Sequence, residues 1–305
     1  MLSICIPIYN YDCTDLIKDL AHQIKQMPEA VELLLADDGS EQSYQEKLQP
    51  LSEFCKLTLL KENIGRARIR NLLSEMASYD HLLFIDGDSS IIHDHYLKNY
   101  IKLIAQEDHA DVICGGSKYP EKAPSQEHLL RWRYSKSREE KGRSYIKNKP
   151  YKSFTTNNFI IKTEVFHQIR FDERIRNYGH EDTLLGYELS KANRSIEYCS
   201  NPVMNGDLDN NEHFLEKTSL GLVNLLRIES FLEQSKDFRN LVPILALYHK
   251  LQQLKIDRLF QLFFRPFKGF VKQRLLRGKG PLVLFDFYRL NILFEEKSKI
   301  KSTGS

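Results

Sequence analysis

The sequence has few cysteines and no pattern of them that would cross-link a fold. Five cysteines are spread widely over 305 residues without a Cys-x-x-Cys pair. They are Cys5, Cys13, Cys55, Cys114 and Cys199. An odd number of scattered thiols argues against a disulfide framework and against a zinc site. The N-terminus also lacks a basic region followed by a long apolar core, so we expect reduced thiols and a cytoplasmic protein.

Long hydrophobic runs are missing as well. No stretch reaches the ~18 consecutive apolar residues that a membrane-spanning helix needs, so any membrane contact is expected to be peripheral. The net charge is only +3, and its local distribution therefore says more about partners than the total does. With 41% hydrophobic residues, the chain can bury a substantial core and is expected to be globular.

What the sequence does contain is an alternation of short apolar runs with helical patterns. Strands are predicted at 3–8, 31–36, 56–60, 82–85, 111–114, 154–161 and 195–198, and helices at 15–27, 66–77, 93–106, 183–192 and from 211 onward. This order predicts an α/β fold with a mainly parallel sheet flanked by helices, followed by a C-terminal helical extension.

The most informative local pattern is Asp86-Gly87-Asp88, which directly follows the apolar run 82–85. That run is short enough for a strand covered on both faces, and ligands in α/β sheets bind where such strands end. Mg²⁺ and Mn²⁺ prefer oxygen ligands, and Mg²⁺ often takes one or two carboxylates while substrate phosphates complete its shell. The pattern therefore predicts a divalent cation that bridges to a diphosphate, although a capped turn would use the same residues.

Three further polar segments follow predicted strands or open predicted helices. Asp37-Asp38-Gly39-Ser40 offers acceptors for a nucleobase imide and ribose hydroxyls, but it also suits a plain turn. The helix opening after Asn63-Ile64-Gly65 carries three arginines, which suit either a diphosphate or a solvated face. Glu181-Asp182 opens another helix, where acids are stabilised by the helix dipole and where a sugar-transfer base would also fit.

Taken together, these segments resemble the inverting family 2 glycosyltransferases with a GT-A fold, of the bacterial cell-surface polysaccharide type. The blocks, in order, are Pro7-Ile8-Tyr9-Asn10, Asp37-Asp38-Gly39-Ser40, Asn63-x-Gly65 through Arg70-Asn71, Asp86-x-Asp88 and Glu181-Asp182. The resemblance covers residues 1–230, with a donor half at 1–116, an acceptor half at 117–230 and an extension at 231–305. It implies transfer from a nucleotide-sugar, with a UDP-sugar expected, to a hydroxyl of a glycan or lipid-linked saccharide, assisted by Mn²⁺ or Mg²⁺.

The resemblance also implies a role for each matching residue. The donor would be held by Pro7, Tyr9, Asn10, Asp37, Asp38, Asn63, Arg70 and Asp86, with Asn157 and Asn158 near the transferred sugar. Asp88 would be the principal metal ligand beside Asp86, and Asp182 would be the base, with Glu181 orienting acceptor or donor. Asn205 stands where relatives often have a histidine, so it would offer the metal only a neutral oxygen. His213, eight residues further on, is an imperfect substitute.

Two segments are strongly basic. Residues 117–152 carry eleven Lys or Arg against four Asp or Glu, without a clear apolar period, and are interpreted as a mobile, electropositive segment that closes over donor or acceptor as a lid. Residues 248–279 carry nine Lys or Arg against one Asp, interleaved with five phenylalanines. This second segment predicts either a helix on an anionic membrane or aromatic packing onto the catalytic domain.

Three other functions remain as alternatives. A sugar nucleotidyltransferase would share the sheet and the acids, but its phosphate-binding loop near the first strand is absent from the sequence. A membrane-associated scaffold with a decayed nucleotide pocket is a non-enzymatic alternative. A nucleic-acid binder would use the basic segments, but acids at the strand ends would repel phosphates, so no nucleic-acid partner is expected.

Overall fold

A seven-stranded sheet organises the first two thirds of the chain. The computed structural model describes residues 1–106, 110–140, 150–175 and 178–303. The strands of the sheet are β1 (Leu2–Ile8), β2 (Val31–Asp37), β3 (Lys56–Leu59), β4 (His81–Ile85), β6 (Val112–Cys114), β8 (Asn158–Lys162) and β9 (Ile196–Tyr198). They lie in the order β3-β2-β1-β4-β8-β6-β9, and β8 runs antiparallel to both of its neighbours. The other pairs are parallel, which confirms the predicted mainly parallel sheet.

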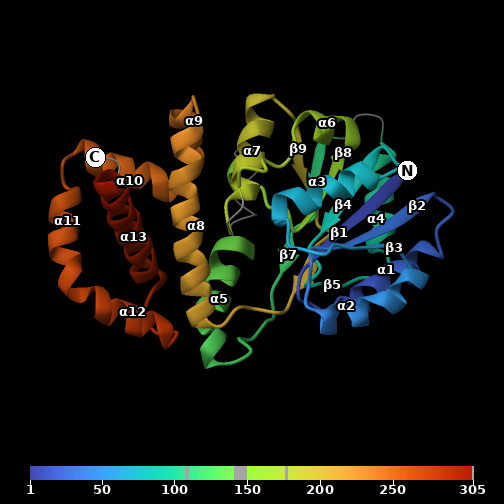
Figure 1. Ribbon diagram of the computed structural model, residues 1–305, viewed down its shortest axis with the longest axis horizontal. Helices are drawn as coiled ribbons and strands as arrows, with labels where there is room; N and C mark the ends of the chain where they lie inside the picture. The colour runs from blue at the N-terminus through green and yellow to red at the C-terminus, as the bar shows by residue number, and fades with distance from the viewer. Residues whose placement is uncertain (107–109, 141–149, 176–177, 304–305) are drawn as a thin grey trace.

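Helices cover both faces of this sheet, as expected for strands that are apolar throughout (Figure 1). They are α1 (Thr14–Ile24), α2 (Gln42–Leu48), α3 (Arg66–Met76), α4 (Tyr96–Ile104), α6 (Thr163–Gln168) and α7 (Glu181–Lys191). Helix α5 (Leu129–Tyr134) packs instead against the helices of the C-terminal third. One hydrophobic cluster joins the sheet to α1 and α4, for example through Leu20 and Leu97. A second joins the opposite face to α3, α6 and α7, for example through Leu73 and Phe166.

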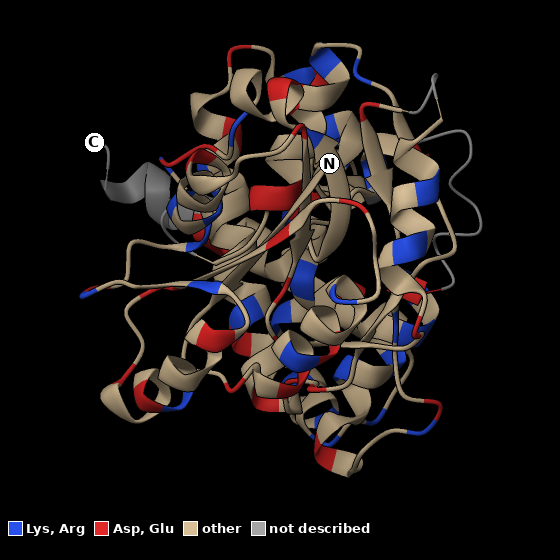
Figure 2. Cartoon of the chain, turned by 90° about the vertical axis from the view of Figure 1, so that its right-hand side faces the viewer, with Lys and Arg blue, Asp and Glu red and all other residues tan. Residues whose placement is uncertain are grey.

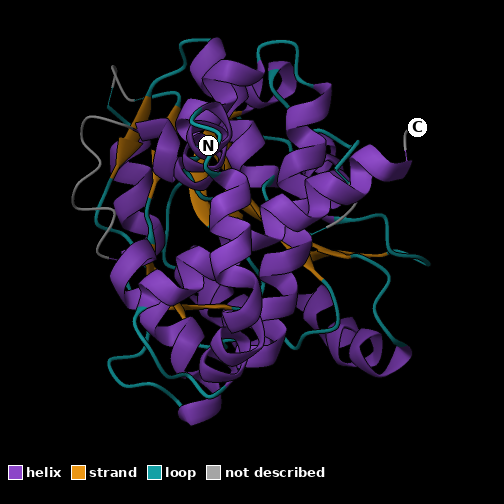
Figure 3. Ribbon diagram, turned by 90° about the vertical axis from the view of Figure 1, so that its left-hand side faces the viewer, coloured by secondary structure: helices purple, strands orange, loops and turns teal. Residues whose placement is uncertain are grey.

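The C-terminal third forms a helical bundle beside the sheet (Figures 1 and 3). Its members are α8 (Asn211–Phe231), α9 (Ser235–Leu241), α10 (Pro243–Gln253), α11 (Asp257–Phe264), α12 (Lys268–Leu276) and α13 (Leu282–Thr303). None of the helices, among the residues that the structure describes, is long and apolar enough to cross a bilayer.

Helix α7 belongs to both parts of the molecule. Leu185 and Leu189 pack in the cluster under the sheet, whereas Leu184 and Tyr187 pack in the cluster that fills the helical bundle. The predicted boundary at residue 231 therefore does not separate two independent cores. The bundle fixes α7 from one side and the sheet fixes it from the other, which matters because α7 begins with Glu181 and Asp182.

A small second sheet was not predicted. Strands β5 (Ser89–Ile91), β10 (Val203–Asn205) and β7 (Ser117–Lys118) form it in the order β5-β10-β7. Asn205 pairs with Ser89, the residue directly after Asp88, so this sheet ties the loop after β4 to the segment before α8.

The segment 117–152 is more regular than its sequence indicates. It contains β7, α5 and a further helical turn at Ser135–Glu140, with 141–149 outside the described residues. Leu130 of α5 is buried in the bundle cluster, and Trp132 Nε1 donates to the carbonyl of Pro120 at 2.7 Å. Buried residues such as Leu130 and side-chain hydrogen bonds therefore hold the described part of the segment, without an apolar stripe.

Candidate functional site

The exits of β1 and β4 meet the starts of α3, α7 and α8 around a cavity of about 700 Å³. Its volume lies within the range of about 300–1,000 Å³ that is typical of ligand sites. Its lining includes seven of the predicted donor and metal residues, which are Pro7, Tyr9, Asp38, Asn63, Arg70, Asp86 and Asp88. Glu181 also lines it, so the structure brings together residues that are up to 174 positions apart in the chain (181 − 7).

Gly87 lets the two acids of the Asp-Gly-Asp turn stand beside β1. A Cβ at position 87 would lie 2.3 Å from Ile8 Cδ1 and 3.2 Å from the Pro7 carbonyl oxygen. Any larger residue would therefore force the end of the Ile8 side chain, or the turn itself, to move. The glycine in this motif allows close packing between the two strand ends.

We expect Gly87→Ala to destabilise the fold by about 1–3 kcal/mol, the usual cost of overpacking a filled site. Chemical denaturation measures the change. The double variant Gly87→Ala/Ile8→Val shortens the clashing side chain. Its loss of free energy of unfolding should be smaller than the sum of the losses of the two single variants. If the losses of the two single variants simply add in the double variant, the contact with Ile8 is not the cause of the destabilisation.

The two acids of the turn lie in different electrostatic surroundings. Asp86 Oδ1 accepts a hydrogen bond from Arg70 at 2.6 Å, and the Arg70 side chain is almost fully buried. Burial and the neighbouring Asp86 carboxylate raise the pKa of Asp88 to about 6, with Asp207 adding to the effect and Arg66 opposing it. Asp88 therefore carries a negative charge that the protein only partly neutralises. A cation at this point would relieve that charge.

At Asp86 and Asp88 the described residues supply carboxylate oxygens but not a complete set of metal ligands. Among the residues that the structure describes, no group of three or more His, Cys, Asp or Glu side chains is arranged to hold a metal. Two carboxylates, as at Asp86 and Asp88, would match the donor set of a Mg²⁺ or Mn²⁺ site in which waters and substrate phosphates supply the remaining ligands. The residues present therefore fit such an ion, and they do not fit a structural zinc site.

The neighbouring acids Asp37 and Asp38 divide into a structural and a cavity-facing residue. Asp37 is fully buried and accepts from the Ser40 amide at 3.0 Å, from the Ser40 hydroxyl and from Gln45 Nε2 at 2.8 Å. It does not line the cavity, and its contacts are those of a turn. Asp38 does line it.

Asp38 also holds the start of α3 in place. Its carboxylate accepts from the amides of Ile64 at 2.7 Å and Gly65 at 3.1 Å. Burial raises the pKa of Asp38, and these two hydrogen bonds oppose that shift. Gly65 has φ 93, in the left-handed region, and directly precedes Arg66 at the start of α3.

Asn10 is a scaffold residue in this structure. Its amide donates to the Ser40 hydroxyl at 2.7 Å, and its side-chain oxygen accepts from the Glu41 amide at 2.8 Å. It thereby ties the loop after β1 to the loop after β2, and it does not line the cavity itself.

Asn157 and Asn158, predicted to lie near the sugar, also have different positions. Asn158 is buried, and its side chain accepts from the hydroxyls of Tyr96 and Tyr100 and donates to two backbone carbonyls. With both functions of the amide satisfied, it fixes the centre of the sheet and does not face a cavity. Asn157 lines a second cavity and bonds to Ser117 and Thr155.

This second cavity, of about 330 Å³, meets the first along Arg66, Arg70, Asp86 and Glu181, which line both. Its far wall comes from α5 and the bundle, through residues such as Arg131, Phe214, Phe285 and Arg289. Asp182 and Asn205 open into it, not into the larger cavity. The helical extension therefore builds part of the site, which the sequence analysis did not predict.

The acids at the start of α7 have opposite pKa shifts. Burial and the charge of Glu181 raise the pKa of Asp182 to about 6, although Thr183 donates to it. Burial also acts to raise the pKa of Glu181, but Arg66, at 3.3 Å, and Arg70 outweigh it and hold that pKa below its usual value. Two adjacent acids with separated pKa values are a frequent feature of acid–base sites.

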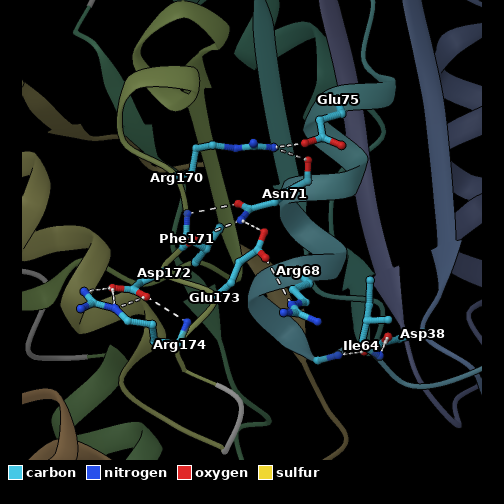
Figure 4. Close-up of polar contacts among 11 residues, drawn as sticks. Asp38, Ile64, Arg68, Asn71, Glu75, Arg170, Phe171, Asp172, Glu173 and Arg174 are labelled. Carbon is cyan, nitrogen blue, oxygen red and sulfur yellow. Dashed lines mark hydrogen bonds and ion pairs between the residues drawn. The ribbon is translucent and has the colours of Figure 1, made fainter.

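Asn71 joins helix α3 to the segment 170–174. Figure 4 shows its side chain between α3 and the segment 170–174 that leads towards α7. Asn71 Nδ2 donates to the Phe171 carbonyl and to Glu173 Oε1, both at 3.0 Å, and its Oδ1 accepts from the Phe171 amide at 3.1 Å. Consecutive residues of one helix, Arg70 and Asn71, therefore contact Asp86 and the segment 170–174.

We expect Asn71→Ala to lower the free energy of unfolding by about 2–4 kcal/mol, because it leaves two buried backbone groups of Phe171 unpaired. Urea denaturation measures this change in the free energy of unfolding. Glu75→Ala is the matched control on the same helix. It removes an exposed ion pair with Arg170 and should cost about 1 kcal/mol or less. Equal losses for the two variants would contradict this role for Asn71.

Several cavity residues were not singled out from the sequence. The segment that leads into α8 contributes Asp207 and Asp209, and α8 itself contributes Lys217. The cavity also contains His213, which the sequence offered only as an imperfect substitute, and Arg66, one of the three arginines at the start of α3. His213 reaches the larger cavity although Asn205 does not. Asp207 acts electrostatically on Asp88. Only the fold could reveal Asp207, Asp209 and Lys217 as cavity residues, because no local pattern marks them.

The fold is that of known sugar-transferring enzymes. A mannosyltransferase from Pyrobaculum calidifontis, solved with GDP-Man and Mn²⁺, matches with a TM-score of 0.53 at 13% identity, over 96% of this chain and 87% of that one. Residues 1–349 of S. aureus TarS, solved with UDP-GlcNAc, match with a TM-score of 0.52 at 19% identity, over 99% of this chain and 92% of that one. At these identities the matches establish the GT-A glycosyltransferase fold.

Sequence comparison adds the family. The family model for glycosyl transferase family 2 matches residues 3–170, more than half of the chain, and the chain belongs to that family. An uncharacterized glycosyltransferase of Haemophilus influenzae is 32% identical over 97 residues. That match covers 31% of this chain and 38% of the relative.

Proposed function

We propose that the protein transfers a sugar from a nucleoside-diphosphate donor to a hydroxyl of a glycan or lipid-linked saccharide, with inversion at the anomeric carbon. One observation carries the proposal. Two cavities meet at Asp86, Arg70 and Glu181, one containing Asp88 and the other Asp182, and both of these acids have a raised pKa. Such an arrangement suits a donor bound in one cavity and an acceptor bound in the other, with their reacting groups meeting where the cavities join.

The larger cavity suits the donor. Tyr9 and Asn63 are exposed at its wall and are available to a base and a ribose, and Asp38 keeps acceptor capacity beyond its two amide bonds. Arg70, held by Asp86, and Arg66, held by Glu181, supply positive charge for a diphosphate. A UDP-sugar remains the donor that we expect.

Asp86 and Asp88 would hold the Mg²⁺ or Mn²⁺ ion, and Asp207 adds negative charge near Asp88. Asn205 opens into the other cavity. When bound, such an ion neutralises the charge that grows on a departing diphosphate. The protein's own contribution is the position of the two carboxylates, fixed by Gly87 against β1 and by β5 against β10.

Asp182 is the proposed base. Its raised pKa increases its affinity for a proton while leaving it mostly ionised at physiological pH, which favours proton abstraction from a sugar hydroxyl. Single displacement by that hydroxyl, with Asp182 taking its proton, inverts the anomeric centre. Glu181 remains ionised beside Arg66 and would orient the reactants.

The direct test is release of nucleoside diphosphate from a panel of UDP-, GDP- and TDP-sugars in Mn²⁺, with chromatographic detection. We expect one donor to be cleaved, slowly to water and faster with a saccharide acceptor. Retention of every donor intact, with and without acceptor, would favour the scaffold with a decayed pocket. Synthesis of a nucleotide-sugar from a sugar phosphate would instead support a nucleotidyltransferase, against which the family membership argues.

A further inference from the structure

The outer face of α11, the turn Arg265–Phe267 and α12 carries an unusual group of exposed apolar side chains. We name this group the outer apolar face. Its members are Leu259, Leu262, Phe263, Phe267 and Phe270. Their exposed fractions run from 52% for Leu259 to 71% for Leu262. Spacings of three, one, four and three residues place them along one side of the helical segment.

The same segment has a second apolar face that packs inward, so core packing does not account for the outer one. Phe260 stacks on Phe264 and contacts Phe294 of α13, with ring centroids 5.5 Å and 5.6 Å apart. Val271 and Leu275 continue this inner face and are buried. The aromatic stripe of the sequence therefore divides into two. One part packs within the helical bundle, against α13 and not onto the catalytic domain, and the other part is exposed.

The outer apolar face lies at the edge of the molecule, where no other element among the described residues packs against it. Helix α11 lies at the edge of the bundle farthest from the sheet (Figure 1), and no residue of α11 is fully buried although five of its eight residues are apolar. Exposed apolar groups of this size mark interaction sites in soluble proteins. The donor and acceptor cavities lie on the other side of α8 and do not include this face.

Cations surround the outer apolar face. Residues 254–279 contain eight Lys or Arg and one Asp, a balance of 8 − 1 = +7, so the rest of the chain carries 3 − 7 = −4. Arg258, Arg265 and Lys272 are exposed, and the Arg274 guanidinium lies 5.6 Å from the Phe270 ring centre. By contrast, acids and bases are interspersed over the sheet end of the molecule (Figure 2).

We propose that this face docks the protein onto an anionic lipid bilayer. Apolar side chains would enter the boundary between headgroups and acyl chains, while the long stems of Lys and Arg carry their charges out to the phosphates. A second copy of the chain is a poor occupant, because a two-fold contact would bring two +7 segments together. Protein interfaces in general have few lysines at their centre.

Vesicle sedimentation tests the proposal with the full-length chain. We expect binding to vesicles of phosphatidylcholine mixed with phosphatidylglycerol, and at least about tenfold weaker binding to phosphatidylcholine alone. The variant Leu262→Asn/Phe263→Asn keeps every charge and should lose at least about tenfold in affinity for the anionic vesicles. Leu220→Asn, which removes an exposed leucine from α8, is the matched control and should bind as the parent does.

Each alternative has its own result. No sedimentation with anionic vesicles would overturn the proposal. Undiminished binding by Leu262→Asn/Phe263→Asn would also overturn it, by showing that charge alone adsorbs the protein. The proposal would also fail if the parent formed a dimer in analytical ultracentrifugation, the variant abolished that dimer, and the parent did not bind vesicles. Membrane docking does not depend on the proposed reaction. Nucleotide binding by the variant is measured separately and should be unchanged, so failure of one proposal can be told from failure of the other.

Discussion

Replacing Asp182 by Asn should lower the rate of sugar transfer by about 10²–10⁴-fold while leaving donor binding unchanged. Asparagine keeps the size of the side chain but cannot accept the proton of the acceptor hydroxyl. Because Asp182 acts as a base only when ionised and its pKa is raised to about 6, the parent rate should rise with pH through about 6 and level off above it. Initial rates across a pH series measure both effects, and normal turnover by Asp182→Asn would remove Asp182 from the mechanism.

The same variant should be more stable than the parent at neutral pH. A folded-state pKa of about 6 exceeds the ordinary value of 3.8, so the folded state binds the proton more tightly than the unfolded chain does. The resulting stabilisation is complete below about pH 4 and is lost as pH rises through 6. The asparagine side chain cannot ionise, so Asp182→Asn should raise Tm at pH 7.5, by a free energy on the order of 1 kcal/mol, with a smaller gain at pH 4.

Asp172 supplies a control of opposite sign. Hydrogen bonds from Arg174 lower the pKa of Asp172, so its contribution to stability is present above the unfolded pKa and lost as pH falls through the folded one. Asp172→Asn should therefore lower Tm at pH 7.5. If both variants shift Tm in the same direction at that pH, the electrostatic explanation for Asp182 is wrong.

Replacing Asp88 by Asn should remove most metal-dependent affinity for a nucleoside diphosphate, by about 100-fold or more, because a cation held by two carboxylates supplies several kcal/mol of charge stabilisation. Protection against thermal unfolding by UDP with Mn²⁺ gives the measurement. Asp94→Asn, at an exposed position beyond β5, is the matched control and should behave as the parent. Equal protection of the parent and Asp88→Asn would place the cation elsewhere.

Much of the fold could be predicted because its signals are local. The buried strand 82–85, the helix after Gly65 and the acidic turn after β4 each follow from residues that are adjacent in the chain. The small sheet could not be predicted, since its strands have two or three residues each and Ser89 pairs with a partner more than a hundred positions away. Such pairing leaves no periodic pattern in the sequence.

The site shows the same division. Asp38 and Asp37 are adjacent and chemically identical, but only one lines the cavity, because Ser40 and Gln45 bind the other. Asn157 and Asn158 differ for a similar reason, since two tyrosines of α4 enclose Asn158. Which neighbour faces the ligand depends on contacts from distant segments. The sequence therefore locates the functional blocks but does not assign every residue within them.

The most direct test of the account is calorimetric titration of the parent protein with UDP and then GDP and TDP, in Mn²⁺ and again in EDTA. The account predicts saturable binding of one of these nucleotides at a single site in Mn²⁺, weakened strongly by EDTA. Absence of binding heat for all three nucleotides in Mn²⁺ would contradict the claim that the cavity at the end of β4 holds a metal-bridged diphosphate.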